Sequence, residues 1–272
     1  MRPISLEADL HLPRERGLSS GGRVQIRLEK ESGVVGICGP SGAGKSTLIR
    51  ILAGLLPRGT GVIRVDGVAW LDSDRGVDLA FEQRAVSCLP QGTGLFSHMT
   101  VRENLLFAHS LSERPDKGRG SLDWFSLSGI FPHWTGSRRR PLPERLLLLV
   151  ERFGIGDLLE KGPGALSGGQ TMKVALVRSF LKETRLYLLD EPLTGIDPEG
   201  RTRLTREVAA LLRERCAMAL WVTHTPGELS PVADGMVALS LDQGSMDRTL
   251  GEDRPPAGFD VPFGRKVAEW RR

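Results

Sequence analysis

Cysteine is scarce in this sequence. The three cysteines, Cys38, Cys88 and Cys216, lie far apart. No pair has the spacing of a zinc site, and an odd number argues against a disulfide framework. Disulfides are rare in reducing compartments, where thiols persist. The sequence therefore excludes a disulfide-stabilised secreted domain and predicts a cytoplasmic location.

Long hydrophobic runs are also absent. The longest uninterrupted apolar segment covers residues 216–222, whereas a membrane-spanning helix needs about 20 apolar residues. The first residues lack the apolar core of a secretory signal. We therefore expect neither a membrane span nor export.

Neither sign of charge dominates the chain. Lys and Arg number 37 and Asp and Glu 33, which gives a net charge of +4. This mildly basic balance suits an anionic small ligand or a membrane surface, and we expect no direct contact with nucleic acid. The 272 residues, 40% hydrophobic and 26% charged, have an ordinary globular composition. That length predicts one large domain or two small ones.

Strict alternation of apolar and polar residues indicates antiparallel strands near the N-terminus. Residues 4–12 alternate in this way, and so do residues 23–29 after a turn-rich stretch. Residues 62–65 and 68–71 flank Asp66-Gly67, a dipeptide typical of two-residue hairpins. A period of two predicts strands with one buried face, so these segments predict an antiparallel β layer.

Continuous apolar runs indicate strands of a second kind. Residues 34–38, 186–189 and 217–222 read as strands buried on both faces of a parallel sheet. Residues from about 92 to 180 show helical patterns and no convincing strand. Within them, residues 112–143 are rich in Gly, Pro, Ser and Arg, which predicts an irregular insertion. We expect an α/β fold with a core sheet, an antiparallel β subdomain and an inserted helical subdomain.

A phosphate-binding motif follows the first apolar run. It reads Gly39-Pro40-Ser41-Gly42-Ala43-Gly44-Lys45-Ser46 and matches G-x-x-x-x-G-K-[ST] between a predicted strand and a predicted helix. Glycines let the backbone approach phosphate oxygens, and N–H groups at a helix start favour an anion. We expect Lys45 to reach the β- and γ-phosphates, Ser46 to bind Mg²⁺ and Thr47 to lie near the α-phosphate. A structural glycine-rich turn is the alternative interpretation.

Two carboxylates end a later apolar strand. Asp190 and Glu191 follow residues 186–189, in the pattern of a Walker B segment. Mg²⁺ prefers oxygen ligands and usually keeps several waters, so Asp190 is a candidate Mg²⁺ ligand, directly or through water. Glu191 is the candidate that polarises an attacking water. Paired acids at a strand end are common, and only their place after the phosphate loop makes them specific.

A third motif carries a family resemblance. Leu166-Ser167-Gly168-Gly169-Gln170 precedes the two carboxylates and matches the signature motif of ATP-binding cassette (ABC) ATPases letter for letter. The remaining marks of the family are present in the expected order along the chain, and the resemblance covers about residues 4–245. Gln91 resembles the Q-loop glutamine, residues 195–197 resemble the D-loop, and His224 resembles the switch histidine.

The resemblance implies a P-loop NTPase (RecA-like) fold and a set of roles. An ABC ATPase domain would cover residues 1–250, with a core at about 1–91 and 181–245, a helical subdomain at about 92–180 and a C-terminal extension at 251–272. ATP and Mg²⁺ would be the cofactors, with Gln91 sensing both and His224 stabilising transferred charge. Two cassettes would pair head to tail, so that Ser167, Gly168, Gly169, Gln170 and Asp197 of one complete the site of the other.

Several of these residues also have ordinary structural interpretations. Asp197 precedes Pro198 and suits a helix N-cap, and both roles can hold at once. Gln91 alone reads as a surface residue, and His224 alone as a structural histidine. The run Arg138-Arg139-Arg140 reads as solvated surface or as a docking site for lipid or permease.

An aromatic residue that stacks on adenine is expected before the phosphate loop in this family. No Phe, Tyr or Trp precedes Trp70 in this chain, so His11 or aliphatic contacts would take that place.

The resemblance points to transport, with a separate membrane permease as the partner and a peripheral site on the cytoplasmic face of the membrane. Residues from Trp70 to Gln91 resemble molybdate-importer ATPases, which suggests import of molybdate or another oxyanion. A soluble ABC ATPase acting on DNA or ribosomes is the alternative. A GTPase is excluded, because the only Asn, Asn104, precedes Leu105 and cannot form a guanine-reading Asn-Lys-x-Asp motif.

Overall fold

The computed structural model describes residues 2–12, 22–56, 59–112, 141–239 and 247–248. The Arg138-Arg139-Arg140 run, most of the insertion expected at 112–143 and the extension expected at 251–272 lie outside these residues. The chain forms two compact units. The first comprises Met1–Gln91, Thr184–Pro192 and Arg201–Arg272, and the second comprises Gly92–Glu183 and Leu193–Gly200.

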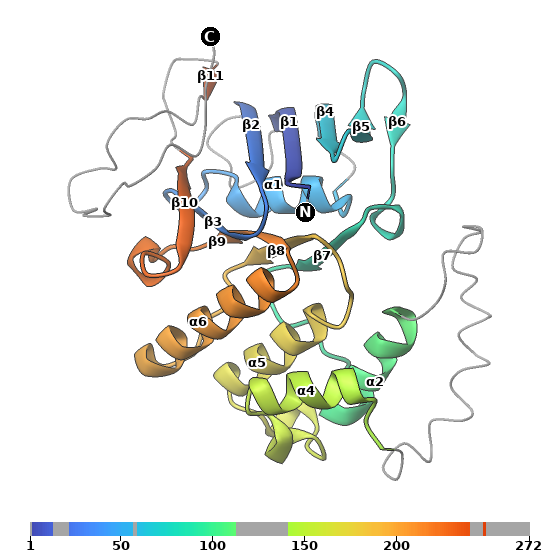
Figure 1. Cartoon of the computed structure of the whole chain (residues 1–272), viewed down its shortest axis with the longest axis vertical. Coiled ribbons are helices and arrows are strands. Elements are labelled where there is room, and N and C mark those ends of the chain that lie inside the picture. The colour runs from blue at the N-terminus through green and yellow to red at the C-terminus, as the bar shows by residue number, and fades with distance from the viewer. Residues whose placement is uncertain (1, 13–21, 57–58, 113–140, 240–246, 249–272) are drawn as a thin grey trace. The chain divides into compact units, whose positions relative to one another are not determined.

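A six-stranded, largely antiparallel sheet belongs to the first unit (Figure 1). Its strands, in spatial order, are β11 (Asp247–Arg248), β2 (Gly22–Lys30), β1 (Ile4–Leu12), β4 (Thr60–Val65), β5 (Val68–Asp72) and β6 (Val77–Asp78). β1 pairs antiparallel with β2 and β4, and its side chains alternate between buried and more exposed positions. Asp66 and Gly67 join β4 to β5 with φ of 49° and 79°, as a type I′ turn requires. The strands and the hairpin predicted for this layer are confirmed.

A five-stranded parallel sheet forms the other layer of the first unit. Its order is β10 (Ala233–Ala238), β3 (Gly33–Cys38), β9 (Met218–Val222), β8 (Leu186–Asp190) and β7 (Val86–Leu89). The three predicted apolar runs form the three central strands. The two edge strands were not predicted, because β7 is short and contains Ser87 and Cys88, and β10 contains Asp234 and Gly235 with a register shift between Ala233 and Gly235.

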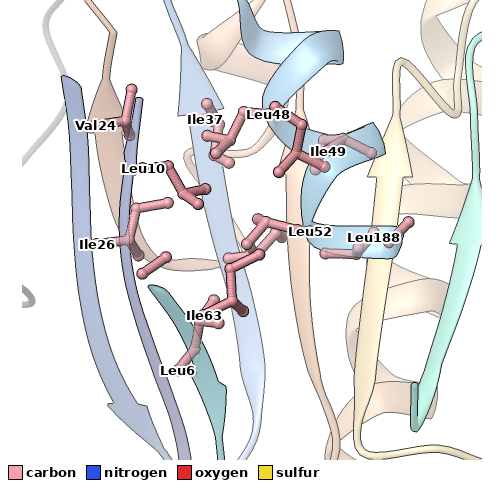
Figure 2. Packing of buried hydrophobic residues seen from close by; sticks show 14 of the residues in the cluster. Leu6, Leu10, Val24, Ile26, Ile37, Leu48, Ile49, Leu52, Ile63 and Leu188 are labelled. Carbon is pink, nitrogen blue, oxygen red and sulfur yellow. The ribbon is translucent and has the colours of Figure 1, made fainter. Parts of the chain in front are cut away.

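Helix α1 (Lys45–Ala53) supplies the centre of the hydrophobic core. Leu48, Ile49 and Leu52 of α1 are completely buried, and they pack with inward-facing residues of both sheets (Figure 2). Leu10 of β1 and Ile37 of β3 are two of these partners. Burial of a Leu or Ile side chain contributes about 1.5–3 kcal/mol, so this shared core holds α1 in a fixed place between the layers.

The described part of the second unit is helical. Its helices are α2 (Val101–Ser112), α4 (Glu144–Arg152) and α5 (Gly168–Ser179), with 3-10 turns η3 (Gly156–Leu158) and η4 (Pro163–Ala165). α2 packs against α5, and the rings of Phe153 and Phe180 stack with centroids 6.1 Å apart. No strand occurs in the described part of residues 92–180, as the sequence predicted. The insertion was expected to begin at Ser112, but that residue is the last of α2.

The remaining elements are helix α6 (Pro198–Glu214) and the 3-10 turns η1 (Phe81–Gln83) and η5 (Pro226–Glu228). Across the residues that the structure describes, no helix combines the length and the apolar character needed to cross a membrane. The three cysteines are free.

Candidate nucleotide site

Four candidate residues follow strands that end at the same edge of the parallel sheet. Gly39 follows β3, Gln91 follows β7, Glu191 follows β8 and His224 follows β9. The strand register brings them to nearly the same level, because Val222 pairs with both Ile37 and Asp190, and Leu89 pairs with Leu189. Ligands of open α/β sheets bind at the carboxyl ends of the strands. The fold therefore gathers residues from four distant parts of the chain at the edge where a ligand is expected.

The loop between β3 and α1 has the backbone of a phosphate-binding turn. Gly39, Gly42 and Gly44 have φ of 149°, 77° and 88°, a region that glycine enters without steric cost. A side chain at position 39 would lie 2.2 Å from the Leu239 carbonyl oxygen. Among the described residues, no side chain caps the N-terminus of α1, so its first N–H groups and its dipole are available to an anion. Pro40, Ser41 and Gly42 line the exposed part of the loop.

Lys45 folds back onto its own loop. Its Nζ donates to the carbonyl oxygens of Gly39 at 2.7 Å and Pro40 at 2.9 Å, and the residue is 5% exposed. Burial lowers the pKa of the ammonium below its usual value, and the charges of Glu191 and Asp190 partly offset that effect. The lysine is thus a buried cation held by neutral carbonyls, ready for exchange onto an anion.

Asp190 is a buried carboxylate that could bind a cation. It is 1% exposed, and neither carboxylate oxygen has a hydrogen bond of normal geometry among the described residues. Burial raises the pKa of this carboxyl, and the nearby Ser46 hydroxyl opposes that shift. A buried, poorly satisfied carboxylate is costly, and a carboxylate beside a hydroxyl suits Mg²⁺, which takes few protein ligands and completes its shell with water and phosphate. Asp190 and Ser46 therefore fit a Mg²⁺ site.

Glu191 is held in an unusual backbone conformation. Its φ is 52°, a left-handed value that costs a non-glycine residue energy and is often found at functional sites. Its N–H donates to the Val222 carbonyl oxygen at 3.0 Å. A carboxylate oxygen of Glu191 lies 2.6 Å from Nε2 of His224, whose side chain is 44% exposed. The sheet therefore brings together the predicted base and the predicted switch histidine, which are far apart in the sequence.

Gln91 leaves β7 beside β8 and is exposed. Among the described residues, the Gln91 side chain forms no hydrogen bond that would fix its position. Its part in binding Mg²⁺ therefore stays a prediction. Thr47 is buried within α1.

The signature residues form the start of α5 in the second unit. Ser167 is the N-cap, and its Oγ accepts from the Gln170 N–H at 3.2 Å while the Gln170 side chain accepts from the Ser167 N–H at 3.0 Å. This reciprocal pair is a capping box. Ser167 and Gly168 are exposed, and a side chain at position 168 would meet no atom of the described residues within 4 Å. The helix start therefore presents its N–H groups outward.

Asp197 lies on the segment that packs against the signature. A side chain at Gly169 would come 2.8 Å from the Gly195 carbonyl oxygen, so these two glycines allow close backbone approach. The Asp197 carboxylate accepts from the Gly200 N–H at 2.8 Å, which makes it the N-cap of α6. The helix-cap interpretation of Asp197 is confirmed, and the residue is exposed.

Sequence reasoning missed two arginines that support these segments. Arg178 of α5 donates to the carbonyl oxygens of Gly94 at 2.6 Å and Thr93 at 2.9 Å. Arg84 donates to carbonyls at the end of α1. An arginine in an amphipathic or irregular segment reads as surface, and only the folded backbone supplies these acceptors.

Comparison with known proteins agrees with this geometry. The family model described as "ABC transporter" matches residues 23–194. The "Molybdenum import ATP-binding protein ModC" of Pseudomonas savastanoi pv. phaseolicola is 35% identical over 239 residues, which cover 85% of this chain and 57% of that protein. The protein of the same name from Rhodospirillum rubrum is 30% identical, and the alignment covers 96% of this chain and 68% of that protein. The chain thus spans little more than half of the Pseudomonas relative.

Solved structures share the fold. A dimeric post-hydrolysis state of the ATP-binding cassette MJ0796, bound to ADP and Pi, superposes with a TM-score of 0.64 at 20% identity, covering 88% of this chain and 97% of that one. A second dimeric structure of MJ0796, a bacterial ABC transporter cassette, superposes with a TM-score of 0.63 at 22% identity. The match covers 87% of this chain and 94% of that one. The match to the family model covers more than half of this chain, and the predicted fold class is confirmed. The chain belongs to the ABC transporter family.

Proposed function

We propose that this chain is the ATP-hydrolysing subunit of an ABC importer, and that its substrate is molybdate or a similar oxyanion. One arrangement carries the proposal. A phosphate loop, a buried carboxylate beside a hydroxyl and a second carboxylate held by an imidazole follow strands that end at one sheet edge. These are the groups that phosphoryl transfer to water requires.

Binding would begin at the phosphate loop. Lys45 would leave the carbonyl oxygens of Gly39 and Pro40 for the β- and γ-phosphates, while the N–H groups of the loop and of α1 hold the other phosphate oxygens. Ser46 and Asp190 would hold Mg²⁺, with Gln91 beside them. When bound, the ion neutralises charge on the phosphates.

Hydrolysis would then depend on Glu191 and His224. The Glu191 carboxylate would accept a proton from the attacking water, as a general base. His224 would fix the orientation of that carboxylate through their 2.6 Å contact. Glu191 interacts electrostatically with Lys45, so its carboxylate would lie near the γ-phosphate that this lysine binds.

The second unit would serve a partner's nucleotide. Ser167 and Gly168 are exposed at the N-terminus of α5, and a helix N-terminus favours an anion. In a head-to-tail pair of cassettes, Ser167 to Gln170 of one copy and the exposed Asp197 would contact the γ-phosphate side of the other copy's site. The dimeric cassettes of the same fold support this pairing.

Import and its cargo are supported by the relatives' names. Proteins named for molybdenum import match most of this chain, which favours a transport subunit over an ABC ATPase acting on DNA or ribosomes. The chain would bind a membrane permease on the cytoplasmic face and would not contact the cargo itself.

Phosphate release from MgATP by the purified chain tests the enzymatic part of the proposal. The specific rate should rise with protein concentration, because two copies complete each site. The importer part is tested by purifying the chain from its native host with associated membranes. Enrichment of a permease supports it, and enrichment of ribosomes or nucleic acid with no permease contradicts it.

A further inference from the structure

A buried arginine lies at the end of α1 opposite the phosphate loop. The Arg84 side chain is 1% exposed, and Arg84 is among the largest completely enclosed side chains in the described part of the protein. A charge is buried only where partners satisfy it, because its desolvation costs several kcal/mol. The groups that contact the Arg84 guanidinium therefore indicate its structural role.

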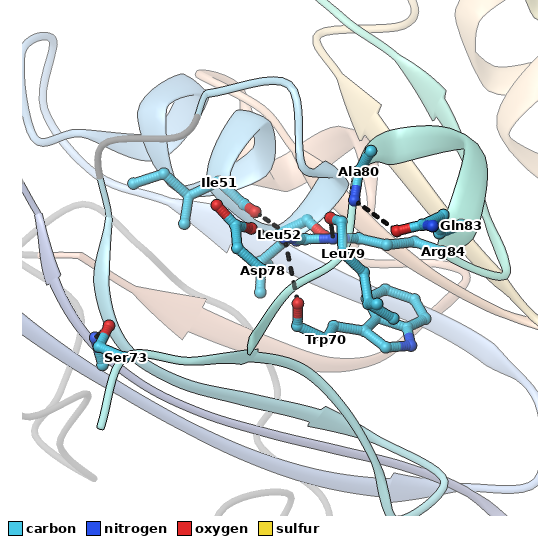
Figure 3. Close-up of polar contacts among 10 residues, drawn as sticks. Ile51, Leu52, Trp70, Ser73, Asp78, Leu79, Ala80, Gln83 and Arg84 are labelled. Carbon is cyan, nitrogen blue, oxygen red and sulfur yellow. Dashed lines mark hydrogen bonds and ion pairs between the residues drawn. The ribbon is translucent and has the colours of Figure 1, made fainter. Parts of the chain in front are cut away.

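The guanidinium binds the last turn of α1. Its Nη1 donates to the carbonyl oxygens of Ile51 at 2.6 Å and Leu52 at 2.8 Å (Figure 3). Carbonyls of the last helical turn lack partners within the helix, and a cation there interacts favourably with the helix dipole. Gly54, just beyond the helix, has φ of 79°, and a side chain there would lie 2.7 Å from Arg84 Nε.

The same guanidinium binds the β subdomain. Nε donates to the Leu79 carbonyl oxygen at 2.8 Å, and Nη2 pairs with the Asp78 carboxylate at 3.1 Å. The guanidinium carbon also lies 5.9 Å from the centroid of the Trp70 ring, within the range of a cation–π contact. One side chain thus joins the end of α1 to β5, β6 and the segment after them.

Arg84 is also close in sequence to the parallel sheet. The Val86 N–H donates to the Arg84 carbonyl oxygen at 2.8 Å, and Val86 begins β7, which pairs along its length with β8. α1 begins with Lys45 and Ser46, and β8 ends with Asp190. A nine-residue helix moves as a rigid body, so an anchor at one end sets the position of the other.

We propose that Arg84 is a positioning residue of the nucleotide site, which anchors the C-terminal end of α1 and thereby fixes Ser46 at the correct separation from Asp190. This proposal rests on the proposed function, in which those two residues share Mg²⁺. Mg²⁺ demands near-ideal octahedral geometry, so a small displacement of α1 weakens Mg²⁺-dependent binding more than binding of the nucleotide alone.

Nucleotide dissociation constants, measured with Mg²⁺ and with EDTA, test the proposal. Arg84→Met should weaken ATP binding about tenfold with Mg²⁺ and less than threefold without it. Arg84→Lys keeps the charge, but its single ammonium cannot bind the α1 carbonyls and also reach Leu79 and Asp78 as the guanidinium does. It should show the same selective loss to a smaller degree. Arg64→Met is the matched control, because it removes a guanidinium of β4 that pairs with the buried Asp72. It should leave both constants unchanged even where it lowers the melting temperature.

Thermal unfolding of each variant separates positioning from bulk stability. If Arg84→Met fails to fold, Arg84→Lys decides the question. The proposal is overturned if the folded Arg84 variant loses stability but binds ATP as the wild type does under both conditions. A wild-type chain that binds no nucleotide overturns the proposed function and this proposal together.

Discussion

His224 Nε2 lies 2.6 Å from a carboxylate oxygen of Glu191, although the two residues follow different strands of the parallel sheet. β8 and β9 pair in register, and the Glu191 N–H donates to the Val222 carbonyl oxygen. The contact is therefore a product of sheet pairing. It makes the two side chains a unit whose members can be tested together.

Glu191→Gln should retain ATP binding and lose turnover by about 10²–10⁴-fold, the usual worth of a general base. His224→Ala should also lower turnover, because the carboxylate loses its orienting partner. If the two act as a unit, the double variant should be no slower than Glu191→Gln alone. Steady-state phosphate release measures all three, and fully additive losses would show that the residues act independently.

Lys45→Ala should weaken ATP binding at least tenfold, because the site loses its buried cation. Lys161→Ala changes an exposed lysine of the second unit and should leave the dissociation constant unchanged. Titration with a fluorescent nucleotide compares the two variants. Equal affinity in both would contradict the phosphate-binding assignment of the loop.

Asp190→Asn should raise the melting temperature of the nucleotide-free chain in EDTA at neutral pH. Burial raises the pKa of Asp190 above the usual 3.8, so the folded state binds its proton more tightly than the unfolded state does. The protonated Asp190 carboxyl therefore stabilises the folded state below pH 3.8, and this contribution is lost as the pH rises through the raised pKa. A gain of about 1 kcal/mol corresponds to roughly 2–4 °C in a chain of this size.

The same variant should lose the Mg²⁺ dependence of nucleotide binding, since an amide is a poor substitute for the carboxylate. The melting-temperature gain should shrink as the pH is lowered toward 3.8. An Asp190→Asn protein that is less stable than the wild type at every pH would contradict the electrostatic account.

Gly169→Ala should destabilise the second unit, because the new methyl group would lie 2.8 Å from the Gly195 carbonyl oxygen. Overpacking of this kind costs about 1–3 kcal/mol. Gly168→Ala is the matched control at the preceding position, where a side chain meets no atom of the described part of the chain within 4 Å. Chemical denaturation should show a loss for the first variant and none for the second, and similar losses in both would rule out the backbone contact as the cause.

Ser167→Arg should abolish hydrolysis while the single chain still binds ATP, because the long side chain would obstruct the partner's γ-phosphate. Ser167→Ala controls for the lost N-cap, which is worth about 1 kcal/mol, and should keep much of the activity. Mixing Ser167→Arg chains with Lys45→Ala chains restores one good interface per hybrid dimer. Phosphate release should therefore recover in the mixture, and no recovery would count against sharing of sites between copies.

Local patterns in the sequence were enough to predict the central strands, the hairpin, the phosphate loop and the order of the family motifs. These features are local: alternation fixes which face of a strand is buried, and Asp66-Gly67 or the loop glycines set their own backbone angles. The edge strands β7 and β10 have no such local pattern, because β7 has only four residues and β10 is interrupted by Asp234 and Gly235.

Contacts between distant residues, in contrast, arise from strand pairing and packing and could not be predicted from local patterns. The 2.6 Å contact of Glu191 with His224 depends on strand register, and the enclosed guanidinium of Arg84 depends on carbonyls of α1 that come much earlier in the chain. A charged side chain has no sequence pattern that distinguishes burial from exposure, because its partners are backbone atoms that every residue carries. Folding alone brings those atoms within reach.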